Sequence, residues 1–553
     1  MSASGPELVQ HYEKLERKRA PHEPKWERMA PYLSPSRVGI MGGTTPGQDQ
    51  MRDVYDGTMM YAAELMANFI SSYLFSPASR WLSYTAGPSD AVREWMEECT
   101  ERSLSRLGAS AFYAEGSESL VDWGGFGTGW LIGEESPQPI NRTIRGFRGF
   151  HWRAAKTGRF VIAEGVDGRV DTGGRQFMMT AEKIAERWGP NGRDRRQPLP
   201  ENVQHAINSG DAQKTFKIIH FIKPRSRFDK GYGNLGMPWA SCWIERESRT
   251  LLQESGYNVF PVAAPRYQQT PDEDYGRGRG DLAWPDNFSL NAAKRLGLED
   301  WALKTRPPLF HQSESITGSL RLVPGAPTSV ITHGRSIRDV IMPMDTGSRP
   351  EVSSIKEEEL RKSIRQIFFV DQILQLLEVH KSEMKAFEFA KKIELVFKLI
   401  GPVYGRASWE LLYQVADITF TTQFHAGAFS PPPREVFDTD GSVNVEFDNP
   451  IARAQRSGDI EALVLGIQDL APIATLYPEV YDRIDPDKTS DGVWNRRGVP
   501  ASWLRNDEEL TAWREARAEQ QQKEQALNDA TQVAEASGAA APMLKVLQGG
   551  QGA

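Results

Sequence analysis

The stretch EVSSIKEEELRKSIRQIFFVDQILQLL, residues 351–377, decides the fold because it is the longest helical pattern in the chain. Its apolar side chains recur at helical spacing and mark one face of a helix. These side chains belong to Val352, Ile355, Leu360, Ile364, Ile367 and Phe368. The run Phe368–Val370 adds an apolar patch of the kind that is typical of an interface. The stretch therefore predicts a long helix whose apolar surface one subunit cannot bury alone.

The residues before this helix extend the pattern. Residues 285–305 are helix-like and end at the Arg306–Pro308 run, because proline cannot continue a helix. Residues 311–344 contain the β-like runs ITGSLRLV and TSVITHG, which are separated by the turn sequence PGAP. The sequence therefore predicts a β-rich insert between two helices.

The residues after this helix continue with a polar interval, 378–384, and then a second helical tract that reaches Phe424. We expect a kink in this tract at Gly401 and Pro402, because proline removes a backbone donor and clashes with the preceding turn. A hairpin is predicted around residues 438–442. Further on, the polar residues 505–533 have a helical composition.

The first half of the chain has two kinds of residue pattern, one helical and one typical of strands. The patterns before residue 123 are helical, with apolar residues spaced three and four apart. Between residues 126 and 261, short apolar runs such as FVIAEG, KIIHFIK and ASCWIE lie between clusters of Gly, Pro, Asn and Asp, which is typical of short strands. Helices and strands thus occupy separate stretches, and the predicted fold class is α+β.

The composition limits the classes of function. The chain has 553 residues, which is enough for roughly two to four structural units. Its 73 Asp and Glu outnumber its 66 Lys and Arg, and a net charge of −7 has the wrong sign for a protein that neutralises phosphates over its whole surface. Two cysteines are too few for a disulfide scaffold. The opening residues do not resemble a secretory signal, and the apolar stretch 61–75 is too short to cross a bilayer, so no membrane contact is expected.

The sequence motifs of catalysis are missing. There is no Walker-type phosphate loop, no H-E-x-x-H pair and no G-x-S-x-G turn. GGFGTG at 124–129 lacks the dinucleotide-binding spacing and favours a tight turn. YGRGRGD at 275–281 allows a flexible basic loop near phosphates or a glycine turn before a helix, and the turn is favoured. We therefore predict no enzyme activity, no catalytic residue, no cofactor and no metal.

Blocks with a shared order run from residue 7 to about 525. They are ELVQHYEKLERKR, WERMAPYLSP, LFSPASRW, YGRGRGDLAWPDNFSLNA, MKAFEFAKKIELVFKLIGPVYGRASWELL, FSPPPREV, VEFDNPIARAQ and GVPASWLRNDEEL. In this order and spacing they resemble the head-to-tail connector (portal) proteins of short-tailed, podovirus-type bacteriophages. The resemblance covers nearly the whole chain.

The resemblance implies a portal fold with a helical stem, a β-rich clip, an α/β wing and a helical C-terminal crown. It also implies a ring of about twelve subunits at one capsid vertex, through which DNA is packaged and ejected. The parts would be the wing at 1–284, a stem helix at 285–307, the clip at 308–350, a second stem helix at 351–377, a tunnel loop at 378–386, a long kinked helix and return to the wing at 387–449, the crown at 450–505, and a C-terminal helical barrel with a flexible tail at 506–553.

The tunnel loop supplies the candidate DNA-channel residues, His380, Lys381 and Lys385. Repeated around a ring, the two lysines would form a basic belt in an otherwise acidic tunnel. A lysine there offers a flexible point charge that can follow passing phosphates. The alternative is that both lysines pair with glutamates on neighbouring helical turns.

The clip supplies the candidate partner-binding residues, Arg321, His333 and Arg335, although it could serve only to pack subunits together. The resemblance implies these partners: other copies of the chain, double-stranded DNA, the terminase large subunit, the major capsid or scaffolding protein, and a tail adaptor protein. We expect the protein in the virion, at the capsid portal vertex, and in the host cytoplasm during assembly. The rival hypotheses are a capsid-associated scaffold or tail adaptor without a DNA channel, and a DNA enzyme without a recognisable motif.

Overall fold

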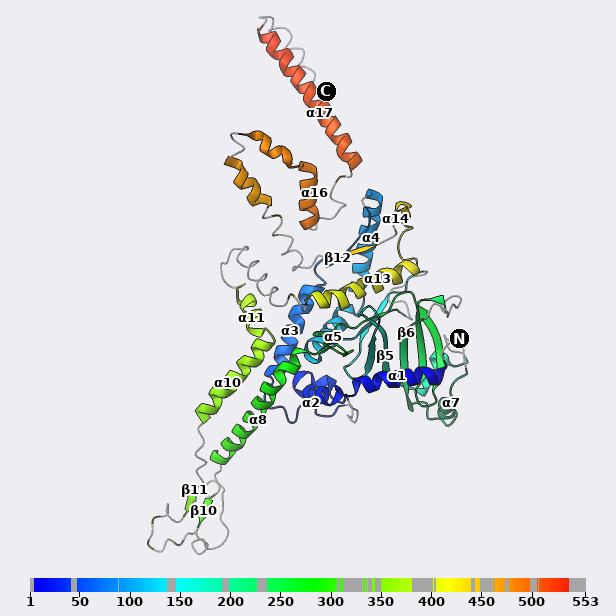
Figure 1. Ribbon diagram of the computed structural model, residues 1–553, viewed down its shortest axis with the longest axis vertical. Coiled ribbons are helices and arrows are strands. Elements are labelled where there is room, and N and C mark those ends of the chain that lie inside the picture. The colour runs from blue at the N-terminus through cyan, green and yellow to red at the C-terminus, as the bar shows by residue number, and fades with distance from the viewer. Residues whose placement is uncertain are drawn as a thin grey trace, which may run out of the picture. The chain divides into compact units, whose positions relative to one another are not determined.

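The computed structural model of the chain (Figure 1) falls into two compact units. The first unit comprises Met1–Leu82, Glu101–Phe429 and Phe447–Gln455, and the second comprises Ser83–Thr100, Ser430–Glu446 and Arg456–Ala553. The structure describes residues 4–40, 47–87, 89–136, 146–190, 198–225, 236–305, 309–311, 331, 334, 336, 341–343, 350–379, 401, 404–438, 443–447, 460, 463–472, 477–497, 505 and 507–536.

The first unit contains a five-stranded antiparallel sheet with the strand order β4-β5-β6-β7-β8. Its strands are β4 (Phe160–Glu164), β5 (Val170–Thr180), β6 (Thr215–Pro224), β7 (Trp239–Glu245) and β8 (Thr250–Tyr257). Each strand pairs with the next in sequence, so the sheet is a meander. The β-rich middle third predicted from the sequence is confirmed, and we call this sheet with its covering helices the wing sheet.

Helices cover both faces of the wing sheet (Figure 1). One face packs on α1 (Gly5–Arg19) through Leu8, Val9, Tyr12, Leu15, Val161, Ile219, Phe221, Ala240, Cys242 and Ile244. The other packs on α6 (Ala181–Trp188) and α7 (Glu201–Asn208) through Ala181, Ile184, Trp188, Leu199, Val203, Ala206, Phe216, Ile218, Trp243 and Leu252. Ile218 and Ile219 are neighbours in β6 and belong to different faces, because side chains alternate along a strand.

The sequence pattern did not predict α6 and α7. It predicted only strands between residues 126 and 261, whereas both helices lie there. Each helix has 8 residues, which is about two turns and gives a helical period little room to repeat.

A further group of elements in the first unit combines helices with a small sheet. The helices are α2 (Glu23–Leu33), the 3₁₀ turn η1 (Pro35–Arg37), α3 (Thr58–Leu74) and α5 (Phe112–Phe126). The sheet has the order β3-β2-β9 and consists of β2 (Leu131–Glu135), β3 (Phe150–Ala154) and β9 (Val262–Ala263). Helix α5 packs against both α3 and β3. Helix α4 (Asp90–Gly108) contributes residues to both units.

The two glycine motifs meet in one backbone contact. Gly127 ends α5 in the left-handed conformation, with a φ of +96°. A Cβ on Gly278 or Gly280 would lie 2.3 or 2.4 Å from the carbonyl oxygen of Gly125. Any side chain at these two positions would therefore clash with the backbone of α5, and glycine has none. Residues 124–126 of the first motif are the last residues of α5, and the predicted turn is confined to the helix end at Gly127. Residues 275–278 of the second motif lead directly into the next helix, which begins at Arg279.

The helix–β–helix order predicted for residues 285–377 is present. Helix α8 (Arg279–Thr305) begins six residues before the predicted start and includes Pro285. Strands β10 (Leu309–His311) and β11 (Ile341–Pro343) pair antiparallel, and α10 (Pro350–Ile367) runs beside α8 (Figure 1).

The stretch 351–377 is not one helix. Helix α10 ends at Ile367, and α11 (Val370–Val379) begins after Phe368 and Phe369. Phe369 has a φ of +59°, which is rare for a bulky residue. Helical periodicity did not predict the break because the apolar spacing continues across it.

The second long helical tract is described from Gly401 onwards, apart from residues 402 and 403. Gly401 is helical, and the kink expected at Gly401–Pro402 stays a prediction. The chain then forms a π-helical turn, η3 (Ser408–Leu412), which continues into α13 (Tyr413–His425).

The second unit is mostly helical. Strands β1 (Leu82–Thr85) and β12 (Asn444–Phe447) form a two-stranded sheet, most of which belongs to this unit. The helices are α14 (Glu435–Asp438), a helix at 463–472, the 3₁₀ helix η4 (Pro478–Arg483), α16 (Pro486–Arg497) and α17 (Asp507–Ala536). The hairpin predicted at 438–442 lies almost wholly outside the described residues. Helices and antiparallel sheets together confirm the α+β class, and no helix in the described ranges is long and apolar enough to span a bilayer.

Candidate functional site: the stem and its base

The functional residues predicted from the sequence lie almost entirely outside the described part of the chain. Those outside it are His380, Lys381, Lys385, Pro402, Arg321, His333 and Arg335. Gly401 is described and is a half-buried helical residue. The structure does describe α8 and α10, the two helices on either side of the predicted clip. We call this pair the stem and treat it, with the contacts at its base, as the candidate site.

Asp56 is the central residue at the base of the stem. Its carboxylate accepts the backbone N–H of Thr58 at 3.0 Å and the Thr58 hydroxyl at 2.5 Å, at the first turn of α3. Arg361 of α10 donates Nε and Nη2 to the same carboxylate at 3.0 and 2.9 Å. These charge-assisted hydrogen bonds join the second stem helix to α3.

The same contacts determine the protonation of Asp56. Burial alone would raise the pKa of this carboxyl group, since a low dielectric disfavours the charged form. The hydrogen bonds from Thr58 and the positive charge of Arg361 outweigh burial and hold the pKa of Asp56 below its usual value. Asp56 is therefore ionised at neutral pH, and the contact with Arg361 is an ion pair.

Helix α8 reaches the same base through a buried amide. Asn291 accepts the backbone N–H groups of Tyr55 and Asp56 at 2.9 and 3.0 Å, and it donates to the Asn287 carbonyl at 3.0 Å. Since a buried amide is costly unless it is hydrogen-bonded, these bonds fix α8 against residues 55–58. No local sequence pattern predicts this network, because Asn291 and Asp56 are 235 residues apart.

Helix α8 also exposes large apolar side chains. Phe288, Leu296 and Leu303 are 62%, 57% and 40% exposed and recur at helical spacing, so they form one stripe. The buried residues of α8, including Leu290 and Asn291, lie on the opposite side of the helix. We call the three exposed residues the stem stripe. A helix that is apolar on two opposite sides is typical of one buried between two partners.

A second buried network connects the π-helical turn to the wing sheet. Arg266 is fully buried, and its guanidinium donates to Glu410 at 2.6 Å, to Glu164 at 3.3 Å and to the Gly168 carbonyl at 2.8 Å. Burial lowers the pKa of Arg266, but the two carboxylates outweigh this and raise it overall. The Arg266 cation is thus neutralised by Glu410 of the π-helical turn and by Glu164 of β4. These two ion pairs attach the turn at Ser408–Leu412 to the β4–β5 hairpin. This network too has no local sequence signal.

One group of described side chains has the residue types of a hydrolytic triad. Ser241 Oγ lies 2.9 Å from His220 Nε2, and His220 Nδ1 lies 3.7 Å from Glu134 Oε1. His220 is fully buried, Ser241 is 2% exposed, and Trp243 stacks on the imidazole at 4.0 Å. Burial lowers the pKa of His220 to about 3. A substrate has no access to this serine, so the group belongs to the packing of the sheet.

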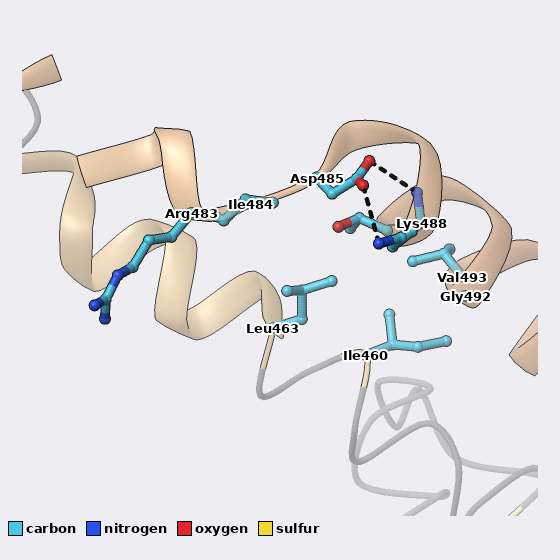
Figure 2. A pocket seen from close by; sticks show the side chains of 9 residues that line it. Ile460, Leu463, Arg483, Ile484, Asp485, Lys488, Gly492 and Val493 are labelled. Atoms are coloured by element: carbon cyan, nitrogen blue, oxygen red, sulfur yellow. Dashed lines mark hydrogen bonds and ion pairs between the residues drawn. The ribbon is translucent and has the colours of Figure 1, made fainter. Parts of the chain in front are cut away.

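Figure 2 shows a hollow in the second unit, between the 463–472 helix and α16. Apolar side chains in its wall include Ile460, Leu463 and Val493. Lys488 forms an ion pair with Asp485 at 3.6 Å, and this carboxylate also accepts the Lys488 backbone N–H at 3.2 Å. The residues around this hollow supply no paired nucleophile and base. No three His, Cys, Asp or Glu side chains within the described ranges are grouped as metal ligands.

The family assignment comes from comparison with known proteins. Residues 6–504 match the model of the family described as bacteriophage head to tail connecting protein, and the chain belongs to this family. It is similar to the probable portal protein of Bordetella phage BPP-1, with 26% identity over 94% of this chain and 92% of that protein. It is also similar to the portal protein of Salmonella phage epsilon15, with 23% identity over 94% of this chain and 92% of that protein.

Solved structures give weaker likenesses. A chain in the virion of a native gene transfer agent particle has 13% identity and a TM-score of 0.32, covering 85% of this chain and 95% of that one. A chain in the neck of the native particle, computed with C12 symmetry, has 14% identity and a TM-score of 0.30, covering 84% and 91%. The portal prediction made from the sequence is confirmed by the family and by the two phage relatives. The alternative of a scaffold or tail adaptor without a channel is not favoured.

Proposed function

We propose that this portal protein works as a closed homo-oligomeric ring of about twelve subunits at the capsid vertex, with the DNA channel on its axis. The observation that carries the proposal is the stem stripe, which leaves Phe288, Leu296 and Leu303 in solvent in a single subunit. Covering a half-exposed side chain of this size is worth roughly 1 kcal/mol or more. A neighbouring subunit would supply that cover.

The stem also offers a second surface for such a contact. Ile355 of α10 is 62% exposed, so each stem presents apolar side chains from both of its helices. A contact between the α8 stripe of one subunit and α10 of the next uses two different surfaces. Contacts of this head-to-tail kind close into rings when the rotation is a simple fraction of a turn.

The channel would be lined in part by the loop 378–386, with His380, Lys381 and Lys385 towards the DNA. The chain has a net charge of −7, so most of the wall would be acidic or neutral. Each phosphate held by Lys or Arg adds salt-dependent affinity, and a wall rich in such contacts would hold DNA still. A few lysines in an acidic tunnel would centre the duplex and still let it slide.

The portal function also suggests partners for the clip and the wing. The clip would bind the terminase large subunit during packaging and a tail adaptor afterwards, through Arg321, His333 and Arg335. The wing would contact the major capsid or scaffolding protein. The chain would assemble in the host cytoplasm and remain in the virion without catalysing a reaction, whereas a DNA enzyme would degrade DNA when given a divalent metal.

Native mass spectrometry of the purified full-length chain, with negative-stain images of the same sample, tests the ring. We expect a closed ring of about twelve copies with an axial hole at micromolar protein concentration. A stable monomer, or an assembly without a hole, would contradict the proposal.

The channel loop has its own test in the variant carrying Lys381→Ala and Lys385→Ala. The ring should form normally, because neither lysine belongs to the stem, and the amount of DNA packaged or retained should fall. Lys183→Ala on the exposed side of α6, away from the stem, is the matched control. Normal packaging and retention by the double variant would show that the two lysines only pair with neighbouring glutamates.

A further inference from the structure

The break between α10 and α11 has an unusual backbone. The N–H of Phe368 still bonds to the Ile364 carbonyl at 3.2 Å, as in an α-helix, but the N–H of Phe369 bonds to the Gln366 carbonyl, three residues back, at 3.1 Å. Helix α11 then starts with the N–H of Ile373 on the Phe369 carbonyl at 3.0 Å. Phe368 and Phe369 separate the two helical segments, and of these two residues only Phe369 has a positive φ, +59°.

The left-handed conformation of Phe369 is strained. Two other described non-glycine residues have a positive φ, Arg249 and Asp272, and both lie in turns. A bulky residue pays a steric cost there, and such strain persists only where the surroundings hold it. Phe368 and Val370, on either side of Phe369, are fully buried and fix the helix ends on both sides of the break.

One side chain from the other stem helix holds Phe369. The guanidinium of Arg279, the first residue of α8, lies 4.5 Å from the centre of the Phe369 ring. Arg279 Nε donates to the Tyr267 hydroxyl at 2.6 Å. A cation over an aromatic face is attracted to it, and the tyrosine fixes the direction of the guanidinium. Arg279 thus connects the start of α8 to the break that follows α10.

The sequence of the same stretch favours the other conformation. Apolar residues continue at helical spacing from Val352 to Phe368 and beyond, which is why one continuous helix was predicted for 351–377. Local pattern and observed backbone therefore disagree at one residue. A disagreement of this kind marks a strained or functional position rather than a random one.

We propose that Phe369 is the pivot of a two-state switch in the stem and that Arg279 is its positioning residue. In the described state, Arg279 stacks on Phe369 and the helix is broken. When the stack is released, Phe369 turns to the right-handed conformation and α10 and α11 join into one helix. The direction of α11 relative to α10 then changes. If the proposed channel loop 378–386 is correct, the switch moves that loop relative to the channel, and this consequence rests on the proposed function.

The two states differ in a distance that can be measured. Lys362 in α10 and Gln375 in α11 are both exposed, and thirteen residues of continuous helix separate their Cα atoms by about 20 Å along the axis. Cysteines placed there can carry spin labels, because native Cys99 and Cys242 are buried. Pulsed electron paramagnetic resonance on rings in which labelled subunits are diluted with unlabelled ones gives the distance distribution. Native mass spectrometry of the same samples reports ring formation separately.

Phe369→Gly and Phe369→Ala form the decisive pair. Glycine also loses the stack on Arg279 but adopts the left-handed conformation without a steric cost, so Phe369→Gly should keep a clearly larger share of the broken-helix distance than Phe369→Ala. Alanine favours the right-handed helix and cannot stack on Arg279, so Phe369→Ala should move most of the distribution to the continuous-helix distance. Arg279→Gln should move it in the same direction, and Arg279→Lys less, because lysine keeps the cation. Identical distributions in the glycine, alanine and Arg279→Gln variants would overturn the switch and leave Phe369 a fixed corner, whether or not the ring forms.

Discussion

The wing sheet and the stem bury their apolar side chains in different ways. Both faces of the wing sheet are closed by helices of the same subunit, and residues such as Ile218 and Ile219 are fully buried. The stem packs one side of α8 against α10 and leaves Phe288, Leu296 and Leu303 on the other side exposed. The wing sheet can therefore be stable in an isolated subunit, whereas in the proposed ring a neighbour would complete the stem.

The wing sheet and the stem also differ in their ion pairs. Beside the wing sheet, the buried Arg266 cation is neutralised by Glu164 and Glu410 of the same subunit. In the stem, Asp56 pairs with Arg361 next to α3, whereas the ion pairs nearer the far end of α8, Arg295 with Glu299 and Lys304 with Asp300, lie within that one helix. One subunit thus fixes where its stem begins, and in the proposed ring the exposed length of α8 would contact another subunit.

The largest effect should come from the stem stripe. Changing Phe288, Leu296 and Leu303 together to Gln removes the apolar cover that a neighbour would provide, and we expect complete loss of the ring. Because all three side chains are already in solvent, the unfolding free energy of the subunit should change by no more than about 0.5 kcal/mol per site. Native mass spectrometry and urea unfolding measure the two quantities.

The control for the stripe is Met178→Gln in β5, where the methionine is 54% exposed. It has the same chemistry outside the stem and should leave the ring intact. A ring that survives the triple change would show that the stem stripe is not an interface.

A matched pair of tryptophans gives the next largest effect. Trp188 is 1% exposed in the wing and donates Nε1 to Gln253 at 2.9 Å, whereas Trp301 of α8 is 67% exposed. Trp188→Ala should cost about 3–5 kcal/mol of unfolding free energy, since it leaves a cavity and an unpaired amide. Trp301→Ala should cost under about 0.5 kcal/mol in the isolated subunit.

These two substitutions are compared by urea unfolding in the ring-deficient background, so that assembly does not contribute to stability. Equal losses from both tryptophans would mean that the stem is buried within one subunit, and the contrast between the regions would fail.

The smallest of the three effects concerns the base of the stem. Asp56→Asn should cost about 1–3 kcal/mol of unfolding free energy at neutral pH, because Arg361 loses the shortest of its three carboxylate contacts and the one that joins it to α3. The pKa of Asp56 is lowered in the folded state, so its contribution is present above the unfolded value near 3.8 and is lost as the pH falls through the folded value.

The wild-type subunit should therefore lose stability relative to Asp56→Asn as the pH falls below about 4. Asp167→Asn, at an exposed turn of the wing, is the control and should follow the wild type. Parallel pH profiles for wild type and Asp56→Asn would contradict the ion pair.

Sequence reasoning predicted the helix at 507–536 from its composition and the β-rich middle third from short apolar runs between turn residues. The family resemblance came from blocks in a shared order. Sequence reasoning missed α6 and α7, which are too short to show a period, and it missed the break at Phe369, where the period continues although the backbone does not. Arg266 and Asn291 could not be predicted, since their partners lie more than a hundred residues away along the chain.

Hydrogen–deuterium exchange tests most directly whether a neighbour completes the stem. It should be followed by mass spectrometry in the wild-type ring and in the stripe variant at equal protein concentration. We expect the amides of α8 and α10 to exchange much faster in the variant, and those of β5, β6 and β7 to exchange at the wild-type rate. Equal protection of the stem in ring and variant, or a loss of protection in the wing sheet as large as that in the stem, would contradict the account.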